Sequence, residues 1–144
     1  MEAKQMSTLA DLKKELAEFN DQFRGKNVQA LGLLGPFDLD PIVNEEVNWD
    51  EKFGSNRPGV YCFFDKAGKT YYVGKASEGS VLGNRVRGHI RWGKKHGSWI
   101  PRTLVTIPVD HELRFVAPGL EEFLIMRLDP YGNTRGRPSD RMKT

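Results

Sequence analysis

Two adjacent carboxylates, Glu121 and Glu122, stand in a segment with the composition of a helix, and helical geometry places them on different faces. Glu122 falls on a mostly polar face and is expected to be exposed. Glu121 shares its face with the core-type residues Ile125 and Leu128. A carboxylate beside apolar side chains is costly unless a cation or hydrogen bonds satisfy it. Glu121 is therefore the better candidate for a metal ligand.

The cations of the chain gather in one segment that has the composition of a polyanion-binding surface. No Asp or Glu occurs from Gly79 to Val109. The cations in that interval are Arg85, Arg87, Arg91, Lys94, Lys95 and Arg102. A field of one sign favours a polyanionic partner, although a solvated basic face would have the same composition.

Two tryptophans, Trp92 and Trp99, flank the basic loop Gly93–Ser98. Cations can neutralise backbone phosphates and indoles can stack on unpaired bases, but the same indoles can also anchor a loop to the core. The nucleic-acid-binding interpretation assigns Arg87, Arg91, Lys94, Lys95 and Trp99 to the contact surface.

Gly59–Phe64 and Thr70–Gly74 are short apolar runs joined by a polar turn. This pattern predicts a β-hairpin, and the two apolar faces of the first run predict a central strand. Tyr61, Tyr71 and Tyr72 lie in these runs, and strand packing alone would account for all three.

The hairpin triplets Gly59-Val60-Tyr61 and Tyr72-Val73-Gly74 resemble the two halves of the motif that names the GIY-YIG nuclease family, with Val in place of Ile. Further features follow in the order that the family has them. They are Leu82, Arg85 and His89 in an L-x-x-R-x-x-x-H element, Glu121 in an LE-x-x-LI context, and Pro130 to Asn133 in P-x-x-N. The resemblance covers residues 57–135.

The resemblance implies a small stand-alone endonuclease that hydrolyses phosphodiester bonds in DNA, with RNA as a possible substrate. It implies an α/β fold of the α+β type, with a central three-stranded antiparallel sheet flanked by helices and an N-terminal helical extension. It also implies one divalent metal ion, Mg²⁺ or Mn²⁺, bound by Glu121.

The resemblance also assigns roles to the tyrosines. Tyr61 or Tyr72 would orient or deprotonate the attacking water, and the family points more to Tyr61, with Tyr72 as a support. A free tyrosine has a pKa of about 10, so a tyrosine base needs a cation close by. Lys75 is the candidate for that cation.

Three more residues complete the implied site. Arg85 would hold the scissile phosphate, because a planar, permanently charged donor suits phosphate oxygens. His89 would hydrogen-bond the phosphate or a catalytic tyrosine. Asn133 would fix the site through hydrogen bonds.

Two other interpretations remain open. The chain can be a nucleic-acid-binding or protein-interaction module that keeps the fold without cutting. Residues 1–58 hold eleven acidic and seven basic side chains, a balance of −4, whereas residues 59–144 have a balance of +7. The acidic part can therefore dock a protein partner or inhibitor, or cover the basic groove.

Composition and length predict one soluble domain with an appendage. The chain has 144 residues, a net charge of +3 and a single cysteine, Cys62, which cannot form an internal disulfide. Residues 1–10 have no apolar core of a signal peptide, and the apolar patch at residues 30–37 is too short to span a bilayer. A cytoplasmic protein with no membrane association is expected.

Periodicity and breakers divide the chain into segments. A helix is predicted from Ser7 or Thr8 to about Phe23, and residues 26–58 contain glycines and prolines that predict an irregular wrap. Another helix is expected at residues 81–92, a third strand at 103–109, and a last helix from Pro118 to about Leu128. The resulting division is 1–56 as helix and wrap packed on the core, 57–135 as the nuclease-like domain, and 136–144 as a basic tail.

Overall fold

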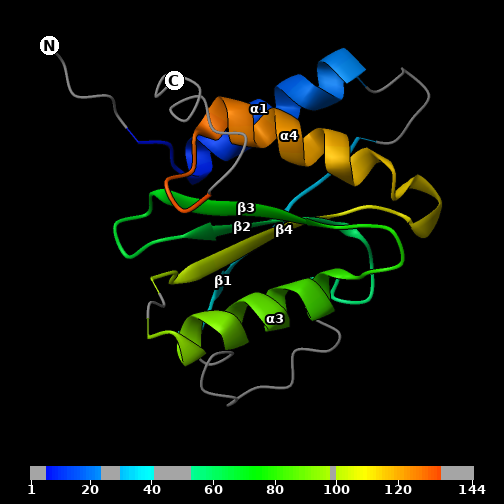
Figure 1. Ribbon diagram of the computed structural model, residues 1–144. Coiled ribbons are helices and arrows are strands. Elements are labelled where there is room, and N and C mark those ends of the chain that lie inside the picture. Colours follow the sequence, from blue (N-terminus) through cyan, green and yellow to red (C-terminus); the bar gives the residue numbers. More distant parts are fainter. Residues whose placement is uncertain (1–5, 24–29, 41–52, 98–99, 134–144) are drawn as a thin grey trace, which may run out of the picture.

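The computed structural model describes residues 6–23, 30–40, 53–97 and 100–133 (Figure 1). The predicted basic tail and Trp99 lie outside these ranges. The elements in chain order are α1 (Leu9–Phe23), β1 (Leu34–Asp38), β2 (Gly59–Phe64), β3 (Thr70–Ala76), α3 (Leu82–Lys95), β4 (Thr103–Pro108), the 3₁₀ helix η1 (His111–Leu113) and α4 (Val116–Leu128). The chain is thus a mixed α+β protein, as the sequence predicts.

The strands form one antiparallel sheet in the order β1-β4-β2-β3. All six residues of β2 are buried and the strand has a neighbour on each side, which confirms its predicted central position. The expected count of three strands is wrong, because β1 adds a fourth at the edge. The Gly35-Pro36 pair in β1 indicates a loop from sequence alone, but an edge strand tolerates a residue without an amide hydrogen.

Helices cover both faces of this sheet (Figure 1). Helices α1 and α4 lie on one face and α3 lies on the other. Successive side chains of β2 alternate between the faces, so Val60 and Cys62 pack in the core beneath α1 and α4, whereas Tyr61 and Phe63 pack in the core beneath α3. The two cores therefore share one central strand.

The helix ends differ from the predictions by two or three residues. Helix α3 continues to Lys95, and α4 begins at Val116, two residues before Pro118. Helix α1 begins close to its predicted start, where the backbone N–H of Thr8 donates to Oδ2 of Asp11 at 2.8 Å. Within the described ranges, no helix has the length and apolar character needed to cross a bilayer.

Helix α1 is an integral part of the fold. Its apolar stripe buries Leu12, Leu16 and Phe19 in the core that α4 also lines. Arg127 of α4 forms ion pairs across the helix interface with Glu15 at 3.5 Å and Glu18 at 3.2 Å. The segment outside the family resemblance therefore contributes a helix and an edge strand to the same structure.

We expect Leu12→Ala to lower the free energy of unfolding by about 2–5 kcal/mol, since the fully buried side chain would leave a cavity. Urea denaturation followed by circular dichroism measures this change. Lys13→Ala, at the exposed neighbouring position, is the control and should alter stability by less than about 0.5 kcal/mol. Equal effects of the two substitutions would contradict the packing of α1 on the core.

Candidate active site

The register of the hairpin explains why a tyrosine and a glycine occur in the two triplets. Tyr61 of β2 lies opposite Gly74 of β3. A Cβ atom at Gly74 would overlap the phenol ring and hydroxyl of Tyr61, so only glycine leaves room for the ring. Gly59 is constrained in the same way by β4, since its Cβ would overlap the carbonyl oxygen of Ile107.

Helix α3 places His89 against both tyrosines. The Tyr61 hydroxyl lies 3.4 Å from Nδ1 of His89, and the His89 ring packs edge-on against Tyr72 with 4.3 Å between ring centroids. The rings of Tyr61 and Tyr72 stack with centroids 6.0 Å apart. Arg85, one turn before His89, donates from Nε to the Lys75 carbonyl at 3.2 Å and so ties α3 to β3.

These side chains line a cleft of about 400 Å³ on the α3 side of the sheet. Four predicted site residues meet there: Tyr61, Tyr72, Arg85 and His89. Asn84, Gly88 and Trp92 complete the lining. Asn84 and Gly88 were not predicted, and only the position of Gly88, three residues after Arg85 on the helix, would have indicated one of them.

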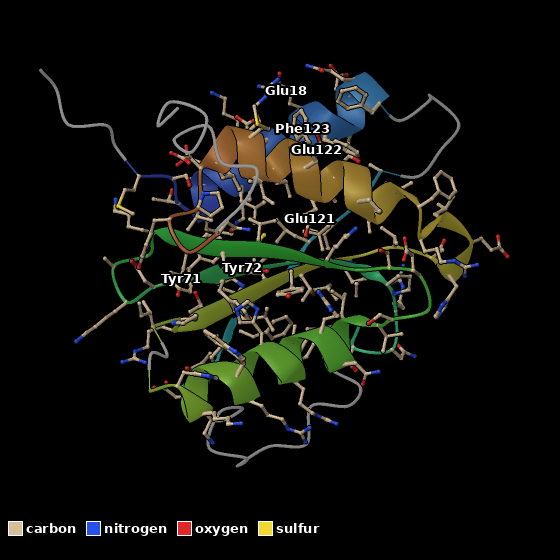
Figure 2. The ribbon with its side chains drawn as sticks, in the orientation of Figure 1. Glu18, Tyr71, Tyr72, Glu121, Glu122 and Phe123 are labelled. Atoms are coloured by element: carbon tan, nitrogen blue, oxygen red, sulfur yellow. The ribbon has the colours of Figure 1, made fainter. Side chains whose placement is uncertain are left out.

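Glu121 approaches from the other helical layer. Figure 2 shows it between α4 and the sheet. Glu121 is half-buried and Glu122 is exposed, which confirms the difference in exposure predicted from helical periodicity. Burial raises the pKa of the Glu121 carboxyl, while the charges of Lys75 and Arg85 act to lower it and that of Glu122 raises it further.

Burial also keeps both tyrosines in their neutral form. The pKa of Tyr61 is raised well above its ordinary value, first by burial and then by Tyr72, and burial and the charge of Glu121 raise the pKa of Tyr72. Arg85 is the cation that opposes both shifts. The charge of Lys75 acts on the Glu121 carboxyl, and its role in assisting a tyrosine stays a prediction.

His89 is neutral at physiological pH. Burial and the nearby positive charge of Arg85 lower the pKa of His89 to about 4. A neutral imidazole carries one donor and one acceptor nitrogen, so it can either accept from or donate to the Tyr61 hydroxyl.

Asn133 lies outside the cleft, on the outer side of the edge strand β3. Its side-chain oxygen accepts from the Val73 N–H and its amide nitrogen donates to the Val73 carbonyl, each at 2.9 Å. These two hydrogen bonds attach Asn133 to the strand that carries Tyr72, and the predicted role of Asn133 in fixing the site stays a prediction. Tyr71, which was assigned to packing, stacks edge-on against Tyr131 with 5.0 Å between centroids.

The predicted nucleic-acid-binding cations lie on α3. Arg91, Lys94 and Lys95 are exposed, while Arg87 is half-buried. The acidic α1 lies on the opposite face of the sheet from α3 (Figure 1). No residue of α1 lines the cleft. The acidic residues between 41 and 52 lie outside the described ranges, so a cover or docking role for them stays a prediction.

The chemistry of Glu121 fits an oxygen-seeking metal ion with one protein carboxylate. The described ranges contain no cluster of three or more His, Cys, Asp or Glu side chains that could hold a metal. Burial penalises the charged form of the half-buried Glu121 carboxyl, and the charges of Lys75 and Arg85 offset this penalty only in part. Mg²⁺ commonly takes one or two carboxylates and keeps several waters, which a single ligand beside an open cleft allows.

Gly74→Ala should lower the free energy of unfolding by about 1–3 kcal/mol, because the added methyl group must displace Tyr61 from a packed position. Gly88→Ala is the matched control, since open space surrounds that helical position. It should raise stability by about 0.5–1 kcal/mol, and thermal melting of both variants checks the pair. Destabilisation by Gly88→Ala alone would contradict the described packing.

The His89 ring should titrate in an NMR experiment with a pKa of about 4, and Arg85→Gln should raise that value by removing one of its two causes. Because the folded state binds this proton more weakly than the unfolded state, His89 lowers stability as pH falls from about 6.5 toward its folded pKa. A His89 titration at or above its ordinary pKa would overturn this description of the site.

Comparisons of the chain with protein-family models, curated proteins and solved structures give no match. The candidate site therefore depends on the residues and geometry of this chain alone.

Proposed function

We propose that the chain is a metal-dependent endonuclease of the GIY-YIG type that hydrolyses phosphodiester bonds in DNA. The proposal depends on one observation above all. Tyr61, Tyr72, Arg85 and His89 line one cleft, and Glu121 is electrostatically coupled to both tyrosines although it comes from the opposite layer.

Arg85 is suited to hold the scissile phosphate. Its side chain is exposed at the cleft, and the hydrogen bond from Nε to the Lys75 carbonyl fixes its orientation. The terminal guanidinium nitrogens remain to donate to phosphate oxygens, in the planar geometry that phosphate favours. Preorganised donors of this kind stabilise the charge that develops in the transition state.

Tyr61 and His89 are suited to orient the attacking water. The Tyr61 side chain is almost fully buried, and its hydroxyl lies 3.4 Å from Nδ1 of His89, so the hydroxyl has a fixed position. The raised pKa of Tyr61 favours an orienting role over that of a tyrosinate base. Tyr72 packs against both rings and limits their movement.

Glu121 would hold Mg²⁺ or Mn²⁺. When bound, such an ion lowers the pKa of a coordinated water and neutralises charge on the phosphate. Lys75 would keep the Glu121 carboxylate ionised and ready to bind, since its charge acts against the upward pKa shift. The cations of α3 would contact phosphates on either side of the cut.

The test is cleavage of supercoiled plasmid, linear duplex, single-stranded DNA and RNA in the presence of Mg²⁺, Mn²⁺ or EDTA. We expect metal-dependent cutting that falls by about 100-fold or more in Glu121→Gln and in Arg85→Ala, because each removes a charge interaction at the reacting phosphate. Glu122→Gln is the matched control, as the adjacent exposed carboxylate should be dispensable.

An equal loss in Glu122→Gln would contradict the assigned role of Glu121. A folded parent that binds nucleic acid in a salt-sensitive manner and cuts none of the four substrates would favour the rival, a binding module that does not cut.

A further inference from the structure

One face of α3 continues beyond the proposed catalytic residues. Arg85, His89, Trp92 and His96 follow one another at offsets of four, three and four residues, which places them in a single stripe along the helix. Arg85 and His89 are at the proposed catalytic end. Trp92 lines the same cleft, and His96 is the residue that ends the helix.

The Trp92 side chain is exposed to solvent and yet held in a fixed orientation. The residue is 59% exposed, although it is one of the largest apolar side chains in the chain. The His96 ring stacks on the indole with centroids 4.3 Å apart and an interplanar angle of 24°. Nδ1 of His96 is hydrogen-bonded to the Trp92 carbonyl oxygen at 2.8 Å, which anchors the supporting ring. The His96 ring therefore supports the indole, while much of the indole surface is exposed to solvent.

The part of the cleft at Gly88, one helical turn before the indole, is also open. Gly88 precedes Trp92 by one helical turn and lines the cleft, and nothing lies within 4 Å of the position that a Cβ would take there. The helical rise places Arg85 and Trp92 about 10 Å apart along the axis. A planar group that reaches Trp92 would thus lie close to a phosphate held at Arg85.

We propose that Trp92, supported by His96, is a stacking platform for an unpaired nucleobase that neighbours the phosphate bound at Arg85. A base inside a duplex has both faces covered by its neighbours, whereas an unpaired base can place one face on an indole. The substrate class is therefore a nucleic acid with unpaired nucleotides at the cleft, such as a single strand, an overhang or a bulge. The position of the base relative to the cut rests on the proposed function, but the stacking itself does not.

The cations beside Trp92 fit the same ligand. Arg91 and Lys95 are exposed on the same stretch of helix and can neutralise the phosphates that flank a stacked base. Base stacking on an aromatic side chain tolerates every base, so the platform selects unpaired structure and not a particular sequence.

The test measures binding in a Glu121→Gln background, with or without Trp92→Ala, at one fixed salt concentration. The probes are DNA and RNA oligonucleotides that carry 2-aminopurine, each as a single strand and as a blunt duplex. We expect the protein to bind the single strand more tightly and to quench its fluorescence by stacking. Trp92→Ala should weaken single-strand binding by about tenfold or more, abolish the quenching and leave duplex binding nearly unchanged.

Two further variants separate stacking from a general disturbance. Trp92→Phe keeps an aromatic face and should retain most of the quenching. Phe115→Ala removes another exposed aromatic side chain, 71% exposed and adjoining α4 on the far side of the sheet, and should change neither binding nor quenching. Circular dichroism and thermal melting establish that each variant is folded.

Unchanged single-strand binding and quenching in folded Trp92→Ala would overturn the platform, even if the parent cuts DNA. A preference for the blunt duplex over both single strands would overturn it as well. Trp92-dependent stacking by a parent that cuts nothing would support the platform and refute the proposed nuclease. The nucleic acid, DNA or RNA, that shows the tighter single-strand binding and the stronger quenching is the preferred ligand.

Discussion

The burial of β2 on both faces is the constraint on which the rest of the structure depends. Because side chains alternate along a strand, a slip of one residue in its pairing would exchange the contents of the two cores. The observed register sends Tyr61 toward α3 and directly over Gly74. A buried phenol needs a partner for its hydroxyl, and α3 supplies one in His89. The register that packs β2 into both cores therefore also fixes the position of Tyr61 beside His89.

Burial shifts the pKa values of four titratable side chains at the candidate site. Burial raises the pKa values of Tyr61, Tyr72 and Glu121 and lowers that of His89, so each of these groups is shifted toward its neutral form. Arg85 and Lys75 oppose the shift of Glu121 only in part. Such a site gains from an added cation, because a bound positive charge would favour the ionised carboxylate without the desolvation penalty of an isolated charge. In the proposed reaction, the opposite charges of the metal ion and the phosphate would make each bind more tightly in the presence of the other.

The features that depend on local sequence patterns were predicted, whereas those that depend on contacts between distant segments were missed. The hairpin and three helices followed from apolar periodicity, and Glu121 was separated from Glu122 by helical phase alone. Strand β1 was missed because Gly35-Pro36 is typical of a loop, and only pairing with β4 makes the segment a strand. Lys75 was assigned to the tyrosines because it follows them in sequence, and only the position of α4 shows that its charge also acts on Glu121. The sequence places Trp92 and His96 one helical turn apart, but the stacking of the His96 ring on the indole is seen only in the structure.

The edge position of β3 explains how two helical layers can serve one site. A strand in the middle of the sheet would separate α4 from α3, whereas at the edge Glu121 from one layer is coupled to Arg85 from the other. An open edge exposes unpaired peptide groups, which invite aggregation. The Asn133 side chain occupies both polar groups of Val73, and the chain from Pro130 to Asn133 runs beside β3, where the N–H of Gly132 donates to the Tyr71 carbonyl at 2.6 Å. The P-x-x-N segment thus covers the edge at Tyr71 and Val73. The half-buried Lys75 lies beyond these contacts, at the part of β3 where the proposed reaction requires both layers to meet.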